Sequence, residues 1–106
     1  PYAQMCPSAA LVIVVCGVPA REKHRDYWVQ DCSAAMENLL LAAHDLGLGA
    51  VWLGVHPRAD RVAGLRGLLN IPEAVTPLCM AAIGWPAESI PPEDRFDSAR
   101  IHLDRW

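Results

Sequence analysis

The feature that most constrains this chain is a stretch that would be apolar on most sides of a helix. Positions 28–46 read WVQDCSAAMENLLLAAHDL, with apolar residues at steps of three and four that define two neighbouring helical faces. The first face holds Val29, Cys32, Met36, Leu40 and Ala43, and the second holds Trp28, Ala35, Leu39, Ala42 and Leu46. Only a narrow polar stripe remains, so we predict a helix at the centre of the fold that other elements cover on most sides.

The residues that flank this stretch indicate where the helix begins and ends. Asp26 can cap its start, and Asp31 lies in its early turns, where a carboxylate suits the helix dipole. Gly47 and Gly49 allow the chain to leave the helix and turn. Residues 50–55 (AVWLGV) then form a short buried strand, in which a glycine at position 54 lets the backbone approach a ligand closely.

Two further strands and one further helix are predicted around this centre. Residues 10–16 (ALVIVVC) and 76–83 (TPLCMAAI) are apolar runs of strand length without alternation, which indicates burial on both faces. Pro57 fits the first turn of a second helix, and Asn70 followed by Pro72 would end it. The apolar stripe of that helix consists of Val62, Leu65, Leu68 and Leu69.

The remaining segments are polar. The loop at residues 17–26 has basic side chains that could contact a phosphate, but Glu22 and Asp26 dilute this charge and favour a solvated loop. Proline, serine and acidic residues dominate positions 86–97, which we expect to run over the surface. Weak alternation at 101–103 predicts a short terminal strand.

Composition limits the classes of protein to which the chain can belong. A length of 106 residues allows one compact domain, and 53% hydrophobic with 20% charged residues excludes disorder. A formal charge of −3 gives no reason to expect nucleic acid or an anionic membrane as a partner. No apolar run reaches the ~18–20 residues of a membrane span. The four cysteines occur singly in apolar contexts, which favours reduced, buried thiols and a cytoplasmic setting.

Several familiar catalytic motifs are disfavoured by the order and spacing of the residues. Gly47-Leu48-Gly49 closes a helix before a strand, whereas a dinucleotide-binding loop lies between a strand and the following helix. The four histidines lie at no ligand spacing from a cysteine or from each other, which disfavours zinc. Cys32 and Cys79 have no evident base nearby and are interpreted as core thiols. We therefore expect no catalytic side chain and no metal ligand.

Three linked segments carry a resemblance to a known family. They are DCSAAMENLLLAAHDLGLGAVWLGV (31–55), VAGLRGLLNIPEAVTPLCMAAIGWPAE (62–88) and DRFDSARIHLDRW (94–106). In this order they resemble the C-terminal half of the FMN-dependent nitroreductase family. Members of that family are considerably longer on the N-terminal side, and this chain begins with Pro1. We therefore expect residues 1–106 to be the C-terminal part of a single nitroreductase-like domain.

The resemblance implies an α+β fold, a three-layer α/β/α sandwich with a mixed, largely antiparallel sheet. Alternation of strands and helices would by itself suggest crossover units and a parallel sheet. Helical connections do not force parallel pairing, so we favour the arrangement that the resemblance implies. It also implies a homodimer in which the central helices pack across the twofold axis and each tail crosses to its partner. The apolar tail residues Ile101, Leu103 and Trp106 fit that arrangement.

The resemblance further implies an oxidoreductase that passes electrons from NAD(P)H through FMN to a nitroaromatic, quinone or similar acceptor. By this resemblance the backbone of Trp52, Leu53 and Gly54 lies along the flavin, and Arg95 contacts the FMN phosphate. The alternative for Trp52, Leu53 and Gly54 is a buried strand with a close-packed glycine. The alternative for Arg95 is a surface arginine paired with Asp94 or Asp97. The family's N-terminal phosphate motif and asparagine-containing loop have no counterpart here. A non-catalytic remnant that keeps the dimer core but does not bind FMN is therefore the alternative function.

Overall fold

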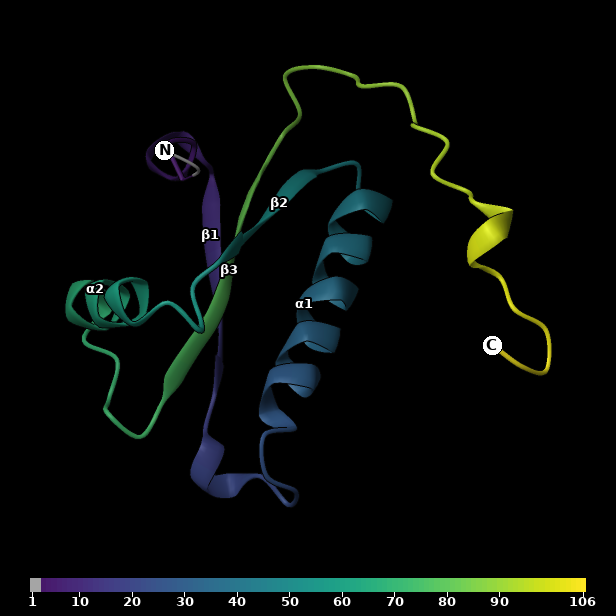
Figure 1. The fold of residues 1–106 in the computed structure, drawn as a ribbon. Helices are drawn as coiled ribbons and strands as arrows, with labels where there is room; N and C mark the ends of the chain where they lie inside the picture. Colours follow the sequence, from purple (N-terminus) through teal and green to yellow (C-terminus); the bar gives the residue numbers. More distant parts are fainter. Residues whose placement is uncertain (1–2) are drawn as a thin grey trace.

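A computed structural model describes residues 3–106 of the chain. The described residues form three strands and two α-helices, which Figure 1 labels along the chain. The elements are β1 (Leu11–Gly17), α1 (Trp28–Asp45), β2 (Gly49–Gly54), α2 (Ala59–Leu69) and β3 (Thr76–Gly84). Short 3-10 helices lie at Cys6–Ser8, Pro19–Arg21 and Ser98–Arg100. The two helices and the three strands predicted within residues 10–83 are present, and their ends lie within two residues of the predicted bounds.

The three strands form one sheet in the order β1-β3-β2. β3 pairs antiparallel with both neighbours, with Leu11 opposite Ile83 on one side and Gly49 opposite Gly84 on the other. The antiparallel sheet implied by the family resemblance is therefore confirmed, and the parallel alternative is wrong. β2 lies at an edge of this sheet, so one side of its backbone has no strand partner within the described residues.

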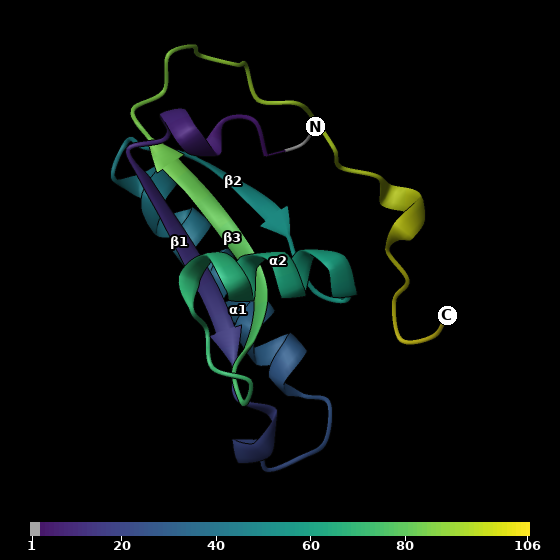
Figure 2. The ribbon, with the colours of Figure 1, turned by 90° about the vertical axis from the view of Figure 1, so that its left-hand side faces the viewer.

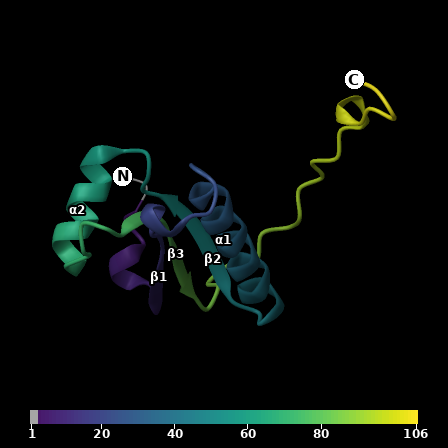
Figure 3. The same ribbon diagram turned by 90° about the horizontal axis from the view of Figure 1, so that it is seen from below.

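The two helices lie on opposite faces of the sheet. Figure 2 shows α2 in front of the strands and α1 behind them, and Figure 3 shows the same three layers from below. The central strand β3 is consequently buried over most of its length, as its unbroken apolar sequence predicts. This is the three-layer α/β/α arrangement predicted from the resemblance.

The core lies between α1 and the sheet. Met36 is completely buried there, together with Cys79 and Ala81 from β3. The first apolar face of α1 packs on this core, which confirms its predicted role. The second face is divided, because Trp28 and Leu39 also pack on this core, whereas Leu46 is 69% exposed and Ala35 and Ala42 are also exposed. Among the described residues, α1 packs chiefly against the sheet, so this chain alone does not provide the cover on most sides that the sequence predicts.

The start of α1 is held by a residue other than the one predicted. Asp26 has a positive φ of 68° and makes no cap, since the residue before the helix is Tyr27. Glu22 reaches across instead, and its carboxylate accepts the backbone N–H groups of Asp26 at 2.9 Å and Trp28 at 3.1 Å. The Trp28 ring packs against Gly17, where an added Cβ would lie 3.1 Å from Cδ2 of the ring. The packing of Trp28 on Gly17 therefore holds the end of β1 against the start of α1.

The turns after each helix follow the predictions more closely. Gly47 has a φ of 72° and ends α1, and Asn70, with a φ of 53°, ends α2. Pro57, however, precedes α2 instead of lying in its first turn. The N–H groups of Val55 and His56 both donate to the Leu78 carbonyl, so the chain leaves β3 only after residue 56. The turn must therefore use positions 57 and 58 before the helix can begin.

The C-terminal tail contains no terminal strand. Beyond β3 the chain runs away from the body of the molecule, as Figure 1 shows in yellow. A 3-10 helix at Ser98–Arg100 precedes residues 101–103, where the predicted strand is absent. A strand needs a partner for its backbone groups, and the extended tail has none within residues 3–106. Ile101, Leu103 and Trp106 are all exposed.

The four cysteines are free thiols, as predicted, although only Cys79 is fully buried. Cys6, Cys16 and Cys32 are partly exposed, which corrects the expectation of buried thiols. Burial raises the pKa of Cys79 to about 11, with smaller contributions from Cys32 and Cys16. The pKa values of Cys16 and Cys32 are also raised, chiefly by burial.

The raised pKa of Cys79 predicts a loss of stability at alkaline pH. In the unfolded chain this thiol ionises near its ordinary value of 9.0, so the unfolded state loses the proton first as pH rises. Ionisation of Cys79 therefore leaves the free energy of unfolding unchanged below about pH 9 and lowers it increasingly between pH 9 and about 11. In urea unfolding across this range, the wild-type midpoint should fall more steeply than that of Cys79→Ala. Parallel pH profiles for the two proteins would contradict the prediction.

Candidate functional site

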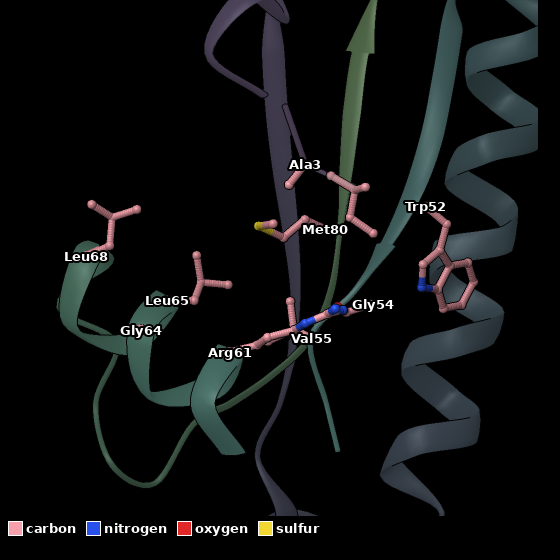
Figure 4. Close-up of a pocket in the computed structure, with 10 residues that line it drawn as sticks. Ala3, Trp52, Gly54, Val55, Arg61, Gly64, Leu65, Leu68 and Met80 are labelled. Carbon is pink, nitrogen blue, oxygen red and sulfur yellow. The ribbon is translucent and has the colours of Figure 1, made fainter. Parts of the chain in front are cut away.

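An open cavity of about 610 Å³ lies on the α2 side of the sheet, at the end of β2. Figure 4 shows it between the end of β2 and the inner side of α2. Its lining is apolar apart from one arginine. It consists of Ala3, Trp52, Leu53, Gly54, Val55, Arg61, Gly64, Leu65, Leu68 and Met80. The structure thus brings the three predicted residues of β2 to one wall of a cavity.

The backbone of β2 presents hydrogen-bonding groups along its free edge. Val55 donates its N–H to Leu78 of β3 at 3.1 Å, so the N–H of Val55 points inward. Neighbouring residues of an antiparallel strand direct their N–H and C=O groups to opposite sides. The groups of Trp52 and Gly54 therefore point outward, away from β3. An outward row of this kind can bond the edge of a flat heterocycle.

Side chains on β2 alternate between the two faces of the sheet. Leu53 lies opposite Met80, is buried, and contributes to the apolar side of the cavity. Trp52 lies opposite Ala81, a member of the core beneath α1, and Figure 4 shows its ring apart from Met80 and Leu65. A Cβ added at Gly54 would meet nothing within 4 Å. The open space at Gly54 therefore lies on the sheet face to which Trp52 also points, next to the bare backbone of the strand end.

Arg61 is the cation of this site, and our sequence analysis did not identify it. Its Nη1 donates to the Gly54 carbonyl at 2.8 Å from the first turn of α2. Leu65 and Leu68 belong to the predicted apolar stripe of this helix, and both line the cavity. The available signal was an arginine seven positions after the strand glycine. Its contact with the strand depends on the turn between them, which the sequence pattern does not specify.

Arg95, the predicted phosphate ligand, does not lie with the other three residues. It is in the extended tail, with a side chain that is 83% exposed, and it pairs with Glu93 at 3.1 Å. Neither of the acids suggested as its alternative partners bonds it. Asp94 accepts the N–H of Phe96, and Asp97 pairs with Arg100. The cavity wall of this chain therefore includes Trp52, Leu53 and Gly54 but not Arg95.

Other kinds of site find no support in the described part of the chain. Residues 3–106 contain no group of three or more His, Cys, Asp or Glu side chains placed to hold a metal ion. Within the same range, neither helix combines the length and hydropathy that would be required to cross a membrane. The cavity at the end of β2 remains the site with the most specific geometry.

Comparison with known proteins identifies the family. A family model described as the nitroreductase family matches residues 2–85. The chain belongs to the nitroreductase family. Its fold agrees, since a nitroreductase-type structure from Bacteroides thetaiotaomicron superimposes with a TM-score of 0.93 at 42% identity, over 100% of this chain and 61% of that one. That protein is described as a candidate NADH dehydrogenase/NAD(P)H nitroreductase.

Two further nitroreductases extend the comparison. A protein of Methanothermobacter thermautotrophicus with the same description is 52% identical over 106 residues, which cover 100% of this chain and 56% of the relative. The structure of an FMN-dependent nitroreductase from Clostridium difficile has a TM-score of 0.84 at 27% identity, over 92% of this chain and 59% of that one. The nitroreductase chain thus spans about six-tenths of the length of these relatives.

Proposed function

We propose that this chain supplies the β2–α2 wall of an FMN site in an NAD(P)H-dependent oxidoreductase. The acceptor would be a nitroaromatic, a quinone or a similar small molecule. The observation that carries the proposal is the outward-facing backbone of Trp52 and Gly54 beside an apolar cavity of about 610 Å³. The FMN-dependent relative and the NAD(P)H nitroreductase names of similar proteins support it.

The residues present fit the ring of FMN better than its phosphate. Leu53, Leu65 and Met80 offer an apolar surface to a flat ring, and Gly54 leaves room for close approach. The Gly54 N–H is aimed outward and can donate to a ring-edge acceptor. Among the lining residues Arg61 alone carries a charge. The wall therefore suits an aromatic group and provides little of the charge that a phosphate dianion needs.

Bound FMN would supply the hydride chemistry, while the protein supplies position and environment. The β2 backbone would orient the ring, and the apolar lining would exclude water from its edge. Arg95 remains a proposed phosphate contact, taken from the family resemblance. Its place in the extended tail favours a phosphate held in the site of a second copy of the chain. We also propose a cytoplasmic setting, which the four free thiols support.

An activity assay tests this proposal. Purified protein supplied with FMN should oxidise NADH or NADPH in the presence of a nitroaromatic or a quinone, and should do so faster than free FMN alone. The two nucleotides and two acceptors should be compared in the same assay to define the substrate class. A rate equal to that of free FMN with every pair would contradict the proposed activity.

The exposed apolar surface supports a further part of the proposal, that the protein is a homodimer. Leu41 is 59% exposed and Leu46 is 69% exposed on α1, and Trp106 is fully exposed in the tail. Covering an apolar side chain of this size contributes roughly 1.5–3 kcal/mol. A twofold dimer in which the α1 helices pack together and each tail lies on its partner would cover these groups.

Deletion of residues 99–106 should therefore weaken the dimer by at least about tenfold, since several apolar contacts are lost. Sedimentation of both proteins at micromolar concentration checks this result. Arg105→Ser is the matched control, because it changes the exposed tail without removing an apolar group, and its association should equal that of the wild type. A well-folded wild-type monomer would show that the proposed interface is wrong.

A further inference from the structure

The peptide groups at the end of β2 are bonded in a pattern that leaves one donor open. The N–H groups of Val55 and His56 donate to the Leu78 carbonyl, and the Val55 carbonyl accepts the N–H of Arg58 at 3.1 Å. The Gly54 carbonyl accepts Nη1 of Arg61 at 2.8 Å. The strand register directs the Gly54 N–H to the outer edge, away from these partners.

The hydrogen bond from Arg61 determines which backbone group of Gly54 remains free to bond a ligand. Without it, the outward Gly54 carbonyl would be a free acceptor beside the free donor, in a segment that contains a glycine and ends a strand. A ligand atom that accepts a hydrogen bond would then meet a repulsive oxygen close to the donor. With the guanidinium bound to that oxygen, the donor is the group left open and the carbonyl is already satisfied.

The charge of Arg61 is also available to the cavity. The four ion pairs recorded within residues 3–106 do not include Arg61, whereas the nearby Arg58 pairs with Asp60 at 3.2 Å. No other lining residue is charged. Arg61 is exposed in this structure, so water screens its charge, and the charge would act more strongly only where a bound ring displaces that water.

We propose that Arg61 is a positioning residue of the flavin site, which holds the Gly54 carbonyl so that the Gly54 N–H faces the ring, and which places a positive charge beside it. This inference rests on the proposed function and assigns a role to a residue outside the strand. A cation near the ring favours the reduced and more negative form, so Arg61 would raise the midpoint potential of the bound flavin as well as its affinity.

The test compares Arg61→Met with the control Arg58→Met. The control also removes one positive charge near the start of α2, but Arg58 does not line the cavity. FMN affinity is measured by quenching of flavin fluorescence, the potential by dye-linked reduction, and folding by thermal unfolding without FMN. We expect Arg61→Met to weaken FMN binding about tenfold, the effect of about 1.4 kcal/mol, and to make the potential more negative. Arg58→Met should change neither.

A conservative variant separates the charge from the hydrogen-bonding geometry and is available if Arg61→Met does not fold. Arg61→Lys keeps the charge, so it should restore the wild-type potential while binding FMN about threefold more weakly. A lower unfolding temperature in both Arg61 variants, with wild-type potential and affinity, would overturn the inference and leave the FMN site in place. A wild-type protein that does not bind FMN would overturn the inference and the proposed function together.

Discussion

Replacing Gly54 with valine is expected to remove FMN binding while leaving the fold intact. A Cβ at this position meets no atom within 4 Å, and valine suits an extended strand, so stability should change by less than about 1 kcal/mol. By the alternation along β2, the added branches would lie on the same face as Trp52, beside the outward Gly54 N–H, where they would block the approach of the ring edge to this donor. Steric overlap in a preformed site costs a few kcal/mol, which corresponds to a loss of affinity of about 100-fold or more.

Fluorescence titration with FMN and thermal unfolding together measure the two halves of this expectation. Gly67→Val is the matched control, because an added Cβ there also meets nothing within 4 Å and the residue lies outside the cavity lining. It should bind FMN as the wild type does. A Gly54→Val protein with wild-type affinity would show that the ring does not lie along this strand.

Met36→Ala should produce the largest loss of stability. Met36 is completely buried between α1 and β3, where it contacts the central core cluster. Removing a large core side chain costs about 2–5 kcal/mol, because the transfer energy is lost and a cavity remains. A chain of this size has a total stability of about 5–15 kcal/mol, so the variant would lose a large share of it.

Equilibrium unfolding in urea measures this loss directly. Glu37→Ala, one position further along the helix, provides the control because Glu37 lies at the surface. Its stability should remain within about 0.5 kcal/mol of the wild type. Equal midpoints for Met36→Ala and Glu37→Ala would contradict the assignment of the core.

The elements with strong periodicity could be predicted from the sequence. The three- and four-residue steps around Met36 identify the face of α1 that packs on the sheet, and the unbroken apolar run of β3 identifies the buried central strand. The same pattern does not tell which molecule covers a second apolar face. Leu46 therefore looks like a core residue in the sequence, although within this chain it is exposed.

Contacts that depend on turn geometry could not be predicted in this way. Asp26 lies two residues before the start of α1, but it has a left-handed backbone and does not cap the helix. The carboxylate of Glu22 accepts the backbone N–H of Trp28 instead. Arg61 reaches Gly54 only because the chain turns tightly between β2 and α2. The strand predicted in the tail lacks a partner, and strand pairing is not visible in local alternation. Nearest-neighbour patterns thus predict elements better than they predict the contacts between elements.

The most direct test of the central claim is a titration of the purified protein with FMN, followed by flavin fluorescence. The β2 edge and the apolar cavity predict quenching that saturates at micromolar FMN, with one flavin bound per chain and a yellow protein after removal of free FMN. Fluorescence that stays unchanged up to high FMN concentration, with a colourless protein, would contradict the claim and favour a non-catalytic remnant of the nitroreductase fold.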